Sequence, residues 1–288
     1  MTVEANLTTK LAKAQSIDMV NIFGNSIQKL LKMLKLEDKI VMPVGSTIKT
    51  YTSKVTLDGT KVDPGDVIPL SKVESEPGPT IELEWDKKRK AVAAEDIQKY
   101  GFEQAISETD TKLLRELQKE IKKKFFAQLN KGTTEVSAKG LQGALAMAWG
   151  TIQEKFEDDD VVTIAFVNPL DIAEYLSKAN ISIQSAFGLK YVEDFLGADV
   201  VVISTGVEKG KLFATASGNL KLAYANMSGG EVSKAFDFIT DETGLIGVSH
   251  DINKTRLTAE TITASAMILF AERLDGIAKV TILPELGA

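Results

Sequence analysis

The sequence contains no cysteine and a single histidine among its 288 residues. The absence of cysteine excludes disulfide bonds, thiolate nucleophiles and every zinc or iron–sulfur site that depends on thiolates. It is compatible with a reducing cytoplasm. With His250 as the only imidazole, a metal site could be built only from carboxylates, and the sequence contains neither an H-E-x-x-H motif nor the ligand spacing of a calcium loop.

Long apolar runs are also missing. The longest ones, at residues 161–167 and 200–203, have the length of buried strands and fall far short of the roughly 18 residues that a membrane span needs. No basic flank with an apolar run marks a secretory signal near Met1, and no membrane partner is expected. The chain is otherwise typical of a soluble globular protein, with 44% hydrophobic and 26% charged residues.

The net charge is −6, which disfavours a strongly basic reader of nucleic acid. A protein that merely encloses nucleic acid remains compatible with this charge.

Motifs for catalysis and cofactor binding are absent. His250 and Asp251 are neighbours, but no G-x-S-x-G nucleophile motif accompanies them, so a surface or hydrogen-bonded histidine is the preferred interpretation. The four acidic residues 157–160 are interpreted as a solvated loop. The segment from Gly206 to Lys211 lacks the spacing of a phosphate-binding loop. We therefore predict no catalytic, cofactor-binding or metal-binding residues, no cofactor and no enzymatic activity.

The first quarter of the chain predicts a helix and then a long hairpin. Residues 1–15 are expected to form an arm that becomes ordered on a partner, followed by an amphipathic helix over residues 16–36. Its apolar positions recur at steps of three and four: Ile17, Val20, Phe23, Ile27, Leu30, Leu31 and Leu34. Strands are expected at 46–57 and 80–85, where the pattern alternates, with turn signals at 58–59, 63–66 and 76–79. Two strands alone are marginal in water, so this hairpin of about residues 46–86 should rest on something else, such as another subunit.

A basic run and a long helix follow the hairpin. Residues 87–90 (KKRK) are interpreted as a solvated turn or strand end, with a phosphate- or acid-binding patch as the alternative. A helix is expected over 110–130, with Leu113, Leu117, Ile121 and Phe125 on its apolar stripe and Gly132 as its C-cap.

The remainder indicates an α/β region and a return to strands. We expect helices at 141–156 and 171–179 and a central strand, buried on both faces, at 161–167. Further strands are expected at 198–204, 211–216, 220–225, 235–239 and 280–283, and residues 258–271 are rich in small apolar side chains.

The order of these parts resembles the Hong Kong 97-type fold of tailed-bacteriophage major capsid proteins. Short sequence segments add to the resemblance. Val167-Asn168-Pro169 before a helix is similar to the entry of the family's axial A-domain, and residues 210–215 and 219–224 are similar to its edge strand pair. Residues 240–247 and 270–277 are similar to the C-terminal part of coat proteins from phages of Gram-positive hosts.

The resemblance implies an α+β capsid fold in five segments. These are an N-terminal arm with a helix (1–45), an extended E-loop hairpin (46–90), a peripheral P-domain with the spine helix (91–136), the A-domain (137–239) and a return to the P-domain (240–288). Some relatives carry a long N-terminal scaffolding region, whereas here the arm helix comes almost at once, so the resemblance implies a separate scaffolding protein or none. Some relatives also crosslink a hairpin lysine to a neighbour, but no motif selects Lys54, Lys61 or Lys72 for that role.

The function implied is that of a structural subunit of an icosahedral virion shell. Subunits would assemble into hexamers and pentamers, and the shell would enclose packaged double-stranded DNA without binding a specific sequence. A portal protein and a separate scaffolding protein are the implied partners, and assembly would take place in the host cytoplasm. The alternatives are an encapsulin-like nanocompartment with the same fold and an unrecognised α/β enzyme.

Overall fold

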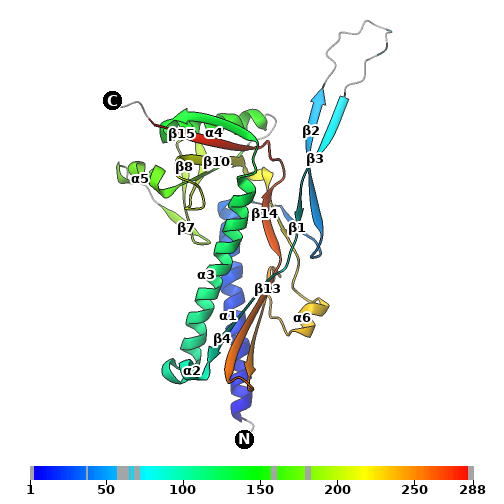
Figure 1. Cartoon of the computed structure of the whole chain (residues 1–288), viewed down its shortest axis with the longest axis vertical. Helices are drawn as coiled ribbons and strands as arrows, with labels where there is room; N and C mark the ends of the chain where they lie inside the picture. The colour runs from blue at the N-terminus through cyan, green and yellow to red at the C-terminus, as the bar shows by residue number, and fades with distance from the viewer. Residues whose placement is uncertain are drawn as a thin grey trace.

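The chain folds into an α+β structure with long helices, several small sheets and one projecting hairpin (Figure 1). The computed structural model describes residues 3–36, 38–56, 65, 67, 72–156, 161–178 and 183–284. The helices are α1 (Val3–Met33), α2 (Ala94–Tyr100), α3 (Phe102–Leu129), α4 (Gly140–Lys155), α5 (Pro169–Lys178) and α6 (Glu231–Ala235), with a 3₁₀ turn at Ser217–Asn219. The first five strands are β1 (Lys39–Val41), β2 (Thr47–Thr56), β3 (Lys72–Glu82), β4 (Asp86–Ala93) and β5 (Thr134–Lys139). The later strands are β6 (Thr163–Val167), β7 (Gln184–Ala186), β8 (Leu189–Phe195), β9 (Ala198–Ile203), β10 (Lys211–Ala216), β11 (Leu220–Tyr224), β12 (Ile246–Asn253), β13 (Thr258–Ser265), β14 (Met267–Ala271) and β15 (Ile277–Leu283).

A mixed sheet with the strand order β5-β15-β10-β6-β9-β8-β7 forms the upper part of the molecule. Strand β6 lies between β10 and β9, and all five of its residues are buried, which confirms the predicted central strand. Its side chains alternate between two cores: Ile164 and Phe166 enter one, and Ala165 and Val167 enter the other. The apolar run therefore has no polar side because both faces of the strand are covered.

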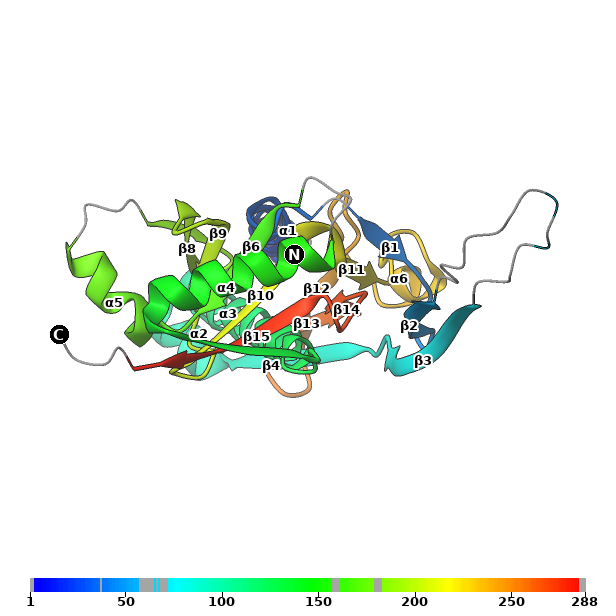
Figure 2. The same ribbon diagram turned by 90° about the horizontal axis from the view of Figure 1, so that it is seen from above.

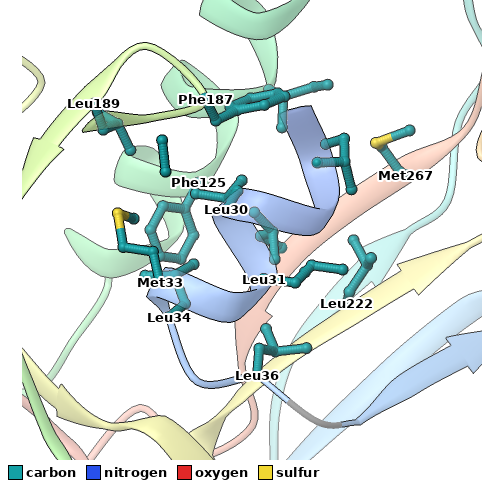
Figure 3. Close-up of a cluster of buried hydrophobic side chains, with 14 of the residues drawn as sticks. Leu30, Leu31, Met33, Leu34, Leu36, Phe125, Phe187, Leu189, Leu222 and Met267 are labelled. Carbon is teal, nitrogen blue, oxygen red and sulfur yellow. The ribbon is translucent and has the colours of Figure 1, made fainter. Parts of the chain in front are cut away.

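Helices cover the two faces of this sheet. Helix α4 packs on one face through Leu145, Ala148 and Ile152 (Figure 2). On the other face, Phe125 and Phe126 of α3 meet Phe166, with ring centroids 5.5 and 5.8 Å from the Phe166 ring. The C-terminal end of α1 joins the same core, where Leu30, Leu34 and other side chains pack around Phe125 (Figure 3).

Two three-stranded sheets support the lower part. One has the order β12-β13-β4 and packs against α1, and the other has the order β1-β11-β14 and packs against α3 (Figure 1). Strand β4 contains the basic run 87–90 in its first half, so the expectation of a solvated turn or strand end is only partly correct: these residues lie near the start of a strand, but they pair with β13 and alternate in exposure. A run of four cations shows no alternation of apolar and polar residues, so the sequence gives no sign of a strand. The strand can form because partners that lie elsewhere in the sequence can neutralise these side chains.

The hairpin β2–β3 projects from one side of the body (Figures 1 and 2). The first predicted strand, at 46–57, is confirmed as β2. The second, at 80–85, is only partly correct: β3 begins at Lys72, runs through residues 76–79, which were expected to break it, and ends at Glu82. The pairing shifts there instead, between Lys49↔Thr80 and Tyr51↔Pro77. A two-stranded ribbon tolerates proline because each strand has an edge that needs no N–H donor.

Both long helices begin earlier than predicted. Helix α1 starts at Val3 rather than near Ser16, so the expected separate arm is part of the helix. Residues 3–15 contain no glycine or proline, and good helix formers let the helix extend. Ile17, which the periodicity placed on the buried stripe, is 48% exposed. Helix α3 starts at Phe102, directly after Gly101, and its extra turns bury Ile106 beside Val92.

Three local predictions in the rest of the chain are wrong. Gly132 does not adopt the left-handed conformation of a helix C-cap. A Cβ at this position would lie only 2.7 Å from Ile277 Cβ, so close packing requires glycine here. Strands β10 and β11 do not pair with each other, since they belong to different sheets. Residues 235–239 form no strand: Ala235 ends α6, and only Ile239 makes an isolated bridge, to Val248.

The boundaries of the five segments remain a prediction. Strand β15, from the final segment, lies between β5 and β10 in the seven-stranded sheet, so segments far apart in the sequence share one sheet.

Candidate functional site

The hairpin β2–β3 projects from the body of the molecule (Figure 1). Its base is anchored: Ile81 is buried beside Ala223 and Phe270. Farther out, Thr56, Lys72 and Pro77 are exposed. Within the described part of the chain, β2 and β3 pair only with each other, so each presents one unpaired backbone edge. Such edges are available to another chain.

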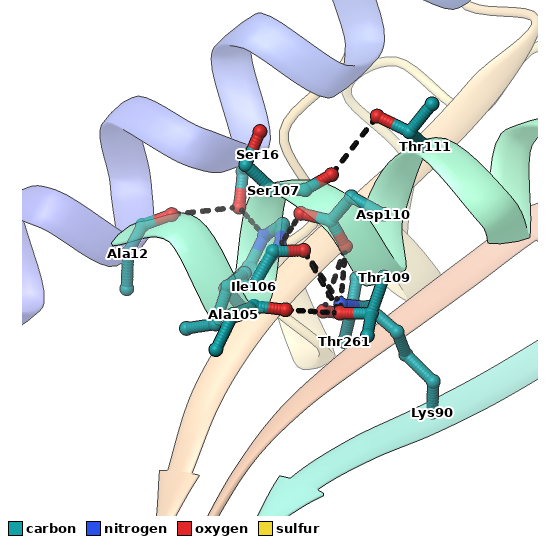
Figure 4. A network of polar contacts seen from close by, with 11 residues as sticks. Ala12, Ser16, Lys90, Ala105, Ile106, Ser107, Thr109, Asp110, Thr111 and Thr261 are labelled. Carbon is teal, nitrogen blue, oxygen red and sulfur yellow. Dashed lines mark hydrogen bonds and ion pairs between the residues drawn. The ribbon is translucent and has the colours of Figure 1, made fainter. Parts of the chain in front are cut away.

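A buried polar network lies at the other end of the molecule, where α1, α3, β4, β12 and β13 meet (Figure 4). His250 Nδ1 is 2.7 Å from the Ser16 hydroxyl, and His250 Nε2 is 2.9 Å from Asp110 Oδ2. The other carboxylate oxygen of Asp110 is 2.8 Å from Lys90 Nζ and accepts a hydrogen bond from Thr261 at 3.2 Å. The His250 and Asp110 side chains are only 3% and 9% exposed.

Burial and bonding compete in setting the protonation of this network. Burial alone would raise the pKa of Asp110, but the hydrogen bonds from His250 and Lys90 outweigh it and lower the pKa below its usual range. For Lys90 burial dominates, and its pKa is lowered even though Asp110 acts in the opposite direction. Lys90 Nζ also donates to the Ile106 carbonyl and to Thr109, so its donors are satisfied.

No family model matches the sequence, and no curated protein matches it. Solved structures do match over most of the chain, at low identity. The capsid of the cyanophage P-SCSP1u gives a TM-score of 0.55 at 10% identity, covering 86% of this chain and 87% of that one. The holo-SrpI encapsulin complex from Synechococcus elongatus gives 0.56 at 13% identity, covering 86% of each. A virus-like particle from Pyrococcus furiosus gives 0.52 at 13% identity, covering 94% and 97%.

The chain has the Hong Kong 97-type capsid fold. The hairpin β2–β3 is its E-loop, and α3 is its spine helix.

The network of His250 contains the residue types of a hydrolytic triad, but its serine cannot act as a nucleophile. Ser16 is 1% exposed and also lies 3.1 Å from the Ala12 carbonyl, which accepts its hydroxyl hydrogen. A cavity of about 290 Å³ between α1 and α3 reaches Asp110, but Ser16 does not line it. Ser16 is also in the middle of a helix, where neighbouring N–H groups are used by the helix and cannot form an oxyanion hole. The arrangement therefore ties two helices to a sheet and does not activate a nucleophile.

The remaining sequence candidates have structural partners. In the basic run, Lys88, Arg89 and Lys90 pair with Glu120, Glu260 and Asp110 at 2.7–2.8 Å, so that among the described residues only Lys87 of the run has no ion pair. Asp251, the sequence neighbour of His250, is exposed and is not part of the network. Among the described residues there is no group of three histidine or acidic side chains that could hold a metal, and no helix is long and apolar enough to cross a membrane. The acidic residues 157–160 and Lys61 lie outside the described residues.

His250 is confirmed as hydrogen-bonded, but its partners could not be found by sequence reasoning. Ser16, Lys90, Asp110 and Thr261 are scattered over 246 positions of the chain, and no spacing links them. One weak signal of the network exists in the sequence. Asp110 lies on the buried face of α3, where the other buried residues are apolar.

Proposed function

We propose that this chain is the major capsid protein of a tailed bacteriophage, a structural protein that self-assembles into the icosahedral head shell around double-stranded DNA. The observation that carries the proposal is the E-loop, which projects from the body and, within the part that the structure describes, is anchored at its base by Ile81. Isolated two-stranded hairpins are marginally stable in water, so a neighbouring subunit is the expected support. The likeness of the whole fold to capsid and shell structures supports the same reading.

The partners follow from this proposal. Subunits would form hexamers and pentamers, and each E-loop would lie on an adjacent subunit, so that many modest contacts add up through multivalency. A portal protein would occupy one vertex, a separate scaffolding protein would guide assembly in the host cytoplasm, and the product would be the virion. With a net charge of −6, the subunit would enclose DNA without binding a sequence.

The proposal is tested by shortening the E-loop. Lys49 and Thr80 are cross-strand partners, so replacing residues 50–79 by Asn-Gly closes a tight hairpin and keeps the Ile81 anchor. The full chain, purified alone or with the scaffolding protein, should form rings or shells in electron micrographs. The shortened chain should remain a folded monomer by light scattering and circular dichroism. A full chain that stays monomeric in every condition, or a shortened chain that assembles equally well, contradicts the proposal.

A second candidate is a nanocompartment shell, because the match to the SrpI encapsulin complex is as extensive as the match to the cyanophage capsid. The contents of particles isolated from the natural source discriminate between the two. Nuclease-protected double-stranded DNA supports the phage head, whereas particles that contain a protein cargo and no DNA support the nanocompartment.

A further inference from the structure

A cavity of about 680 Å³ lies between the spine helix α3 and the β7–β8 turn, where five lysines line it. We call it the lysine pocket; its lysines are Lys119, Lys122 and Lys123 of α3, Lys190 of β8 and Lys211 of β10. Glu208 is the only carboxylate in its lining, and Phe126 and Phe213, which are 6% and 5% exposed, form an aromatic wall. An aromatic wall with a cationic rim suits a segment that carries an apolar ring beside acidic groups.

The charges of the lysine pocket are only partly neutralised. Lys119 pairs with Glu116, and Lys211 pairs with Glu208. In the part of the chain that the structure describes, Lys122, Lys123 and Lys190 form no ion pair. Lys122 is half-buried and donates only to the Gly188 carbonyl, at 3.4 Å, and burial lowers the pKa of its ammonium. A partly desolvated cation without a counter-ion is stabilised when an anionic group arrives.

The backbone of the pocket does not offer a phosphate cradle. Along the loop from Gly206 to Lys211, the N–H groups of Gly206, Val207, Gly210 and Lys211 donate to oxygens of the chain itself. A phosphate-binding loop needs such groups to be free. Recognition therefore rests on separate lysine side chains, which act as point charges and suit single carboxylates.

Residues 231–242 have the complementary character. They contain Glu231, Asp237, Asp241 and Glu242 against Lys234, so four acidic groups and one basic group give a net charge of −3. Phe236 is 59% exposed and Val232 is 42% exposed. Asp237, next to Phe236, has a φ of 50°, a left-handed conformation that a non-glycine residue seldom adopts and that is common at functional positions.

The lysine pocket and this segment lie on opposite sides of the subunit. Helix α6 is on the side of the E-loop, and β7, β8 and α5 are on the other side, in both views (Figures 1 and 2). Two different complementary patches on opposite sides generate a heterologous contact, which closes into a ring when the rotation between neighbours allows it.

We propose that the segment 231–242 of one subunit docks in the lysine pocket of the next subunit of the capsomer, with Phe236 against the aromatic wall and Asp237 beside the unpaired lysines. This inference rests on the proposed shell function and names the surface that closes the ring. It adds a contact between subunit bodies that is independent of the E-loop.

The absence of cysteine makes a direct test possible. A chain with Lys234→Cys and Lys123→Cys contains only these two thiols, and a short bis-maleimide reagent can join them only where the two sites approach. Because the sites lie on opposite sides of one subunit, links must form between subunits. Assembled particles should give a ladder on a denaturing gel, from dimers up to the size of the ring. The control pair is Lys234→Cys with Lys112→Cys. Lys112 is exposed on α3, the helix that carries Lys123, but it does not line the pocket.

Charge exchange provides the second measurement. Lys122→Glu with Lys123→Glu should reduce the yield of particles by at least about tenfold, because like charges would meet in the contact. Adding Glu231→Lys and Asp237→Lys should restore most of that yield. Circular dichroism of each subunit checks that it is folded.

The outcomes separate the two proposals. Particles that form but give no more ladder than the control pair overturn the docking and leave the shell function intact. Particles of Lys122→Ala with Lys123→Ala that assemble normally but hold less DNA also overturn it, since the pocket would then serve nucleic acid. A full chain that never assembles overturns both proposals.

Discussion

His250 Nε2 lies 2.9 Å from the Asp110 carboxylate, although 140 residues separate them in the chain. The contact joins β12 to the spine helix, and through Ser16 it reaches α1. Three elements of the lower part of the molecule are thus held by one imidazole whose two nitrogens both have partners.

We expect His250→Ala to destabilise the subunit by about 2–3 kcal/mol, because the buried polar groups of Ser16 and Asp110 each lose one of their partners. Urea denaturation of the unassembled subunit measures the change. Asp251→Ala is the matched control, since that neighbouring side chain is exposed, and its midpoint should be close to that of the unchanged protein. Equal effects of the two substitutions would show that the network contributes little.

The stability of the subunit should fall in acid in a way that depends on Asp110. Burial would raise the pKa of Asp110, but His250 and Lys90 lower it overall, so the folded state favours the charged form. This stabilisation is fully present above the unfolded pKa, about 3.9, and is lost as the pH falls through the lower folded value. Asp110→Asn should therefore cost about 3 kcal/mol at pH 7, with a difference from the unchanged protein that shrinks below about pH 4. Urea titrations at several pH values test this, and a difference that stays constant with pH contradicts it.

Adjacent cations of β4 should respond differently to substitution. Lys90 is buried beside Asp110, so we expect Lys90→Ala to destabilise the subunit by about 2–3 kcal/mol with little dependence on salt. Arg89 is half-exposed beside Glu260, and a surface ion pair of this kind is screened. Arg89→Ala should hardly move the urea midpoint. Comparison of the two variants at low and high salt checks the contrast, and a large salt-sensitive loss for Lys90→Ala would refute it.

Substitutions of Gly132 test whether glycine is needed there as a helix cap or because of close packing. At a left-handed cap asparagine is tolerated, whereas here any Cβ would meet Ile277 at 2.7 Å. We expect Gly132→Asn and Gly132→Ala to destabilise by about 1–3 kcal/mol each. Gly150→Ala, in a helix with open space around it, should instead stabilise by about 0.5–1 kcal/mol. Thermal unfolding of the three variants decides the matter, and a tolerated Gly132→Asn would restore the cap interpretation.

Much of the fold could be predicted from patterning. The alternating run at 46–57, the stripe of α3 from Leu117 to Phe125, and the uninterrupted apolar run of β6 each became the expected element. Patterning worked there because side chains on a buried face must recur with the period of the backbone. It failed in β4, where the alternating positions are occupied by cations, and at the starts of α1 and α3, which lie well before the predicted helix boundaries.

The absence of catalytic motifs, the segment order and the hairpin without a local partner were determined by the sequence alone. Local pattern records which face of an element is buried, and it cannot record what covers that face. Only the tertiary structure decided that β10 and β11 join different sheets, that Lys90 and His250 converge on Asp110, and that the β7–β8 turn beside the lysine pocket and helix α6 lie on opposite sides of the subunit. These are relations between residues far apart in the chain, created when the elements pack together, and no spacing within the sequence encodes them.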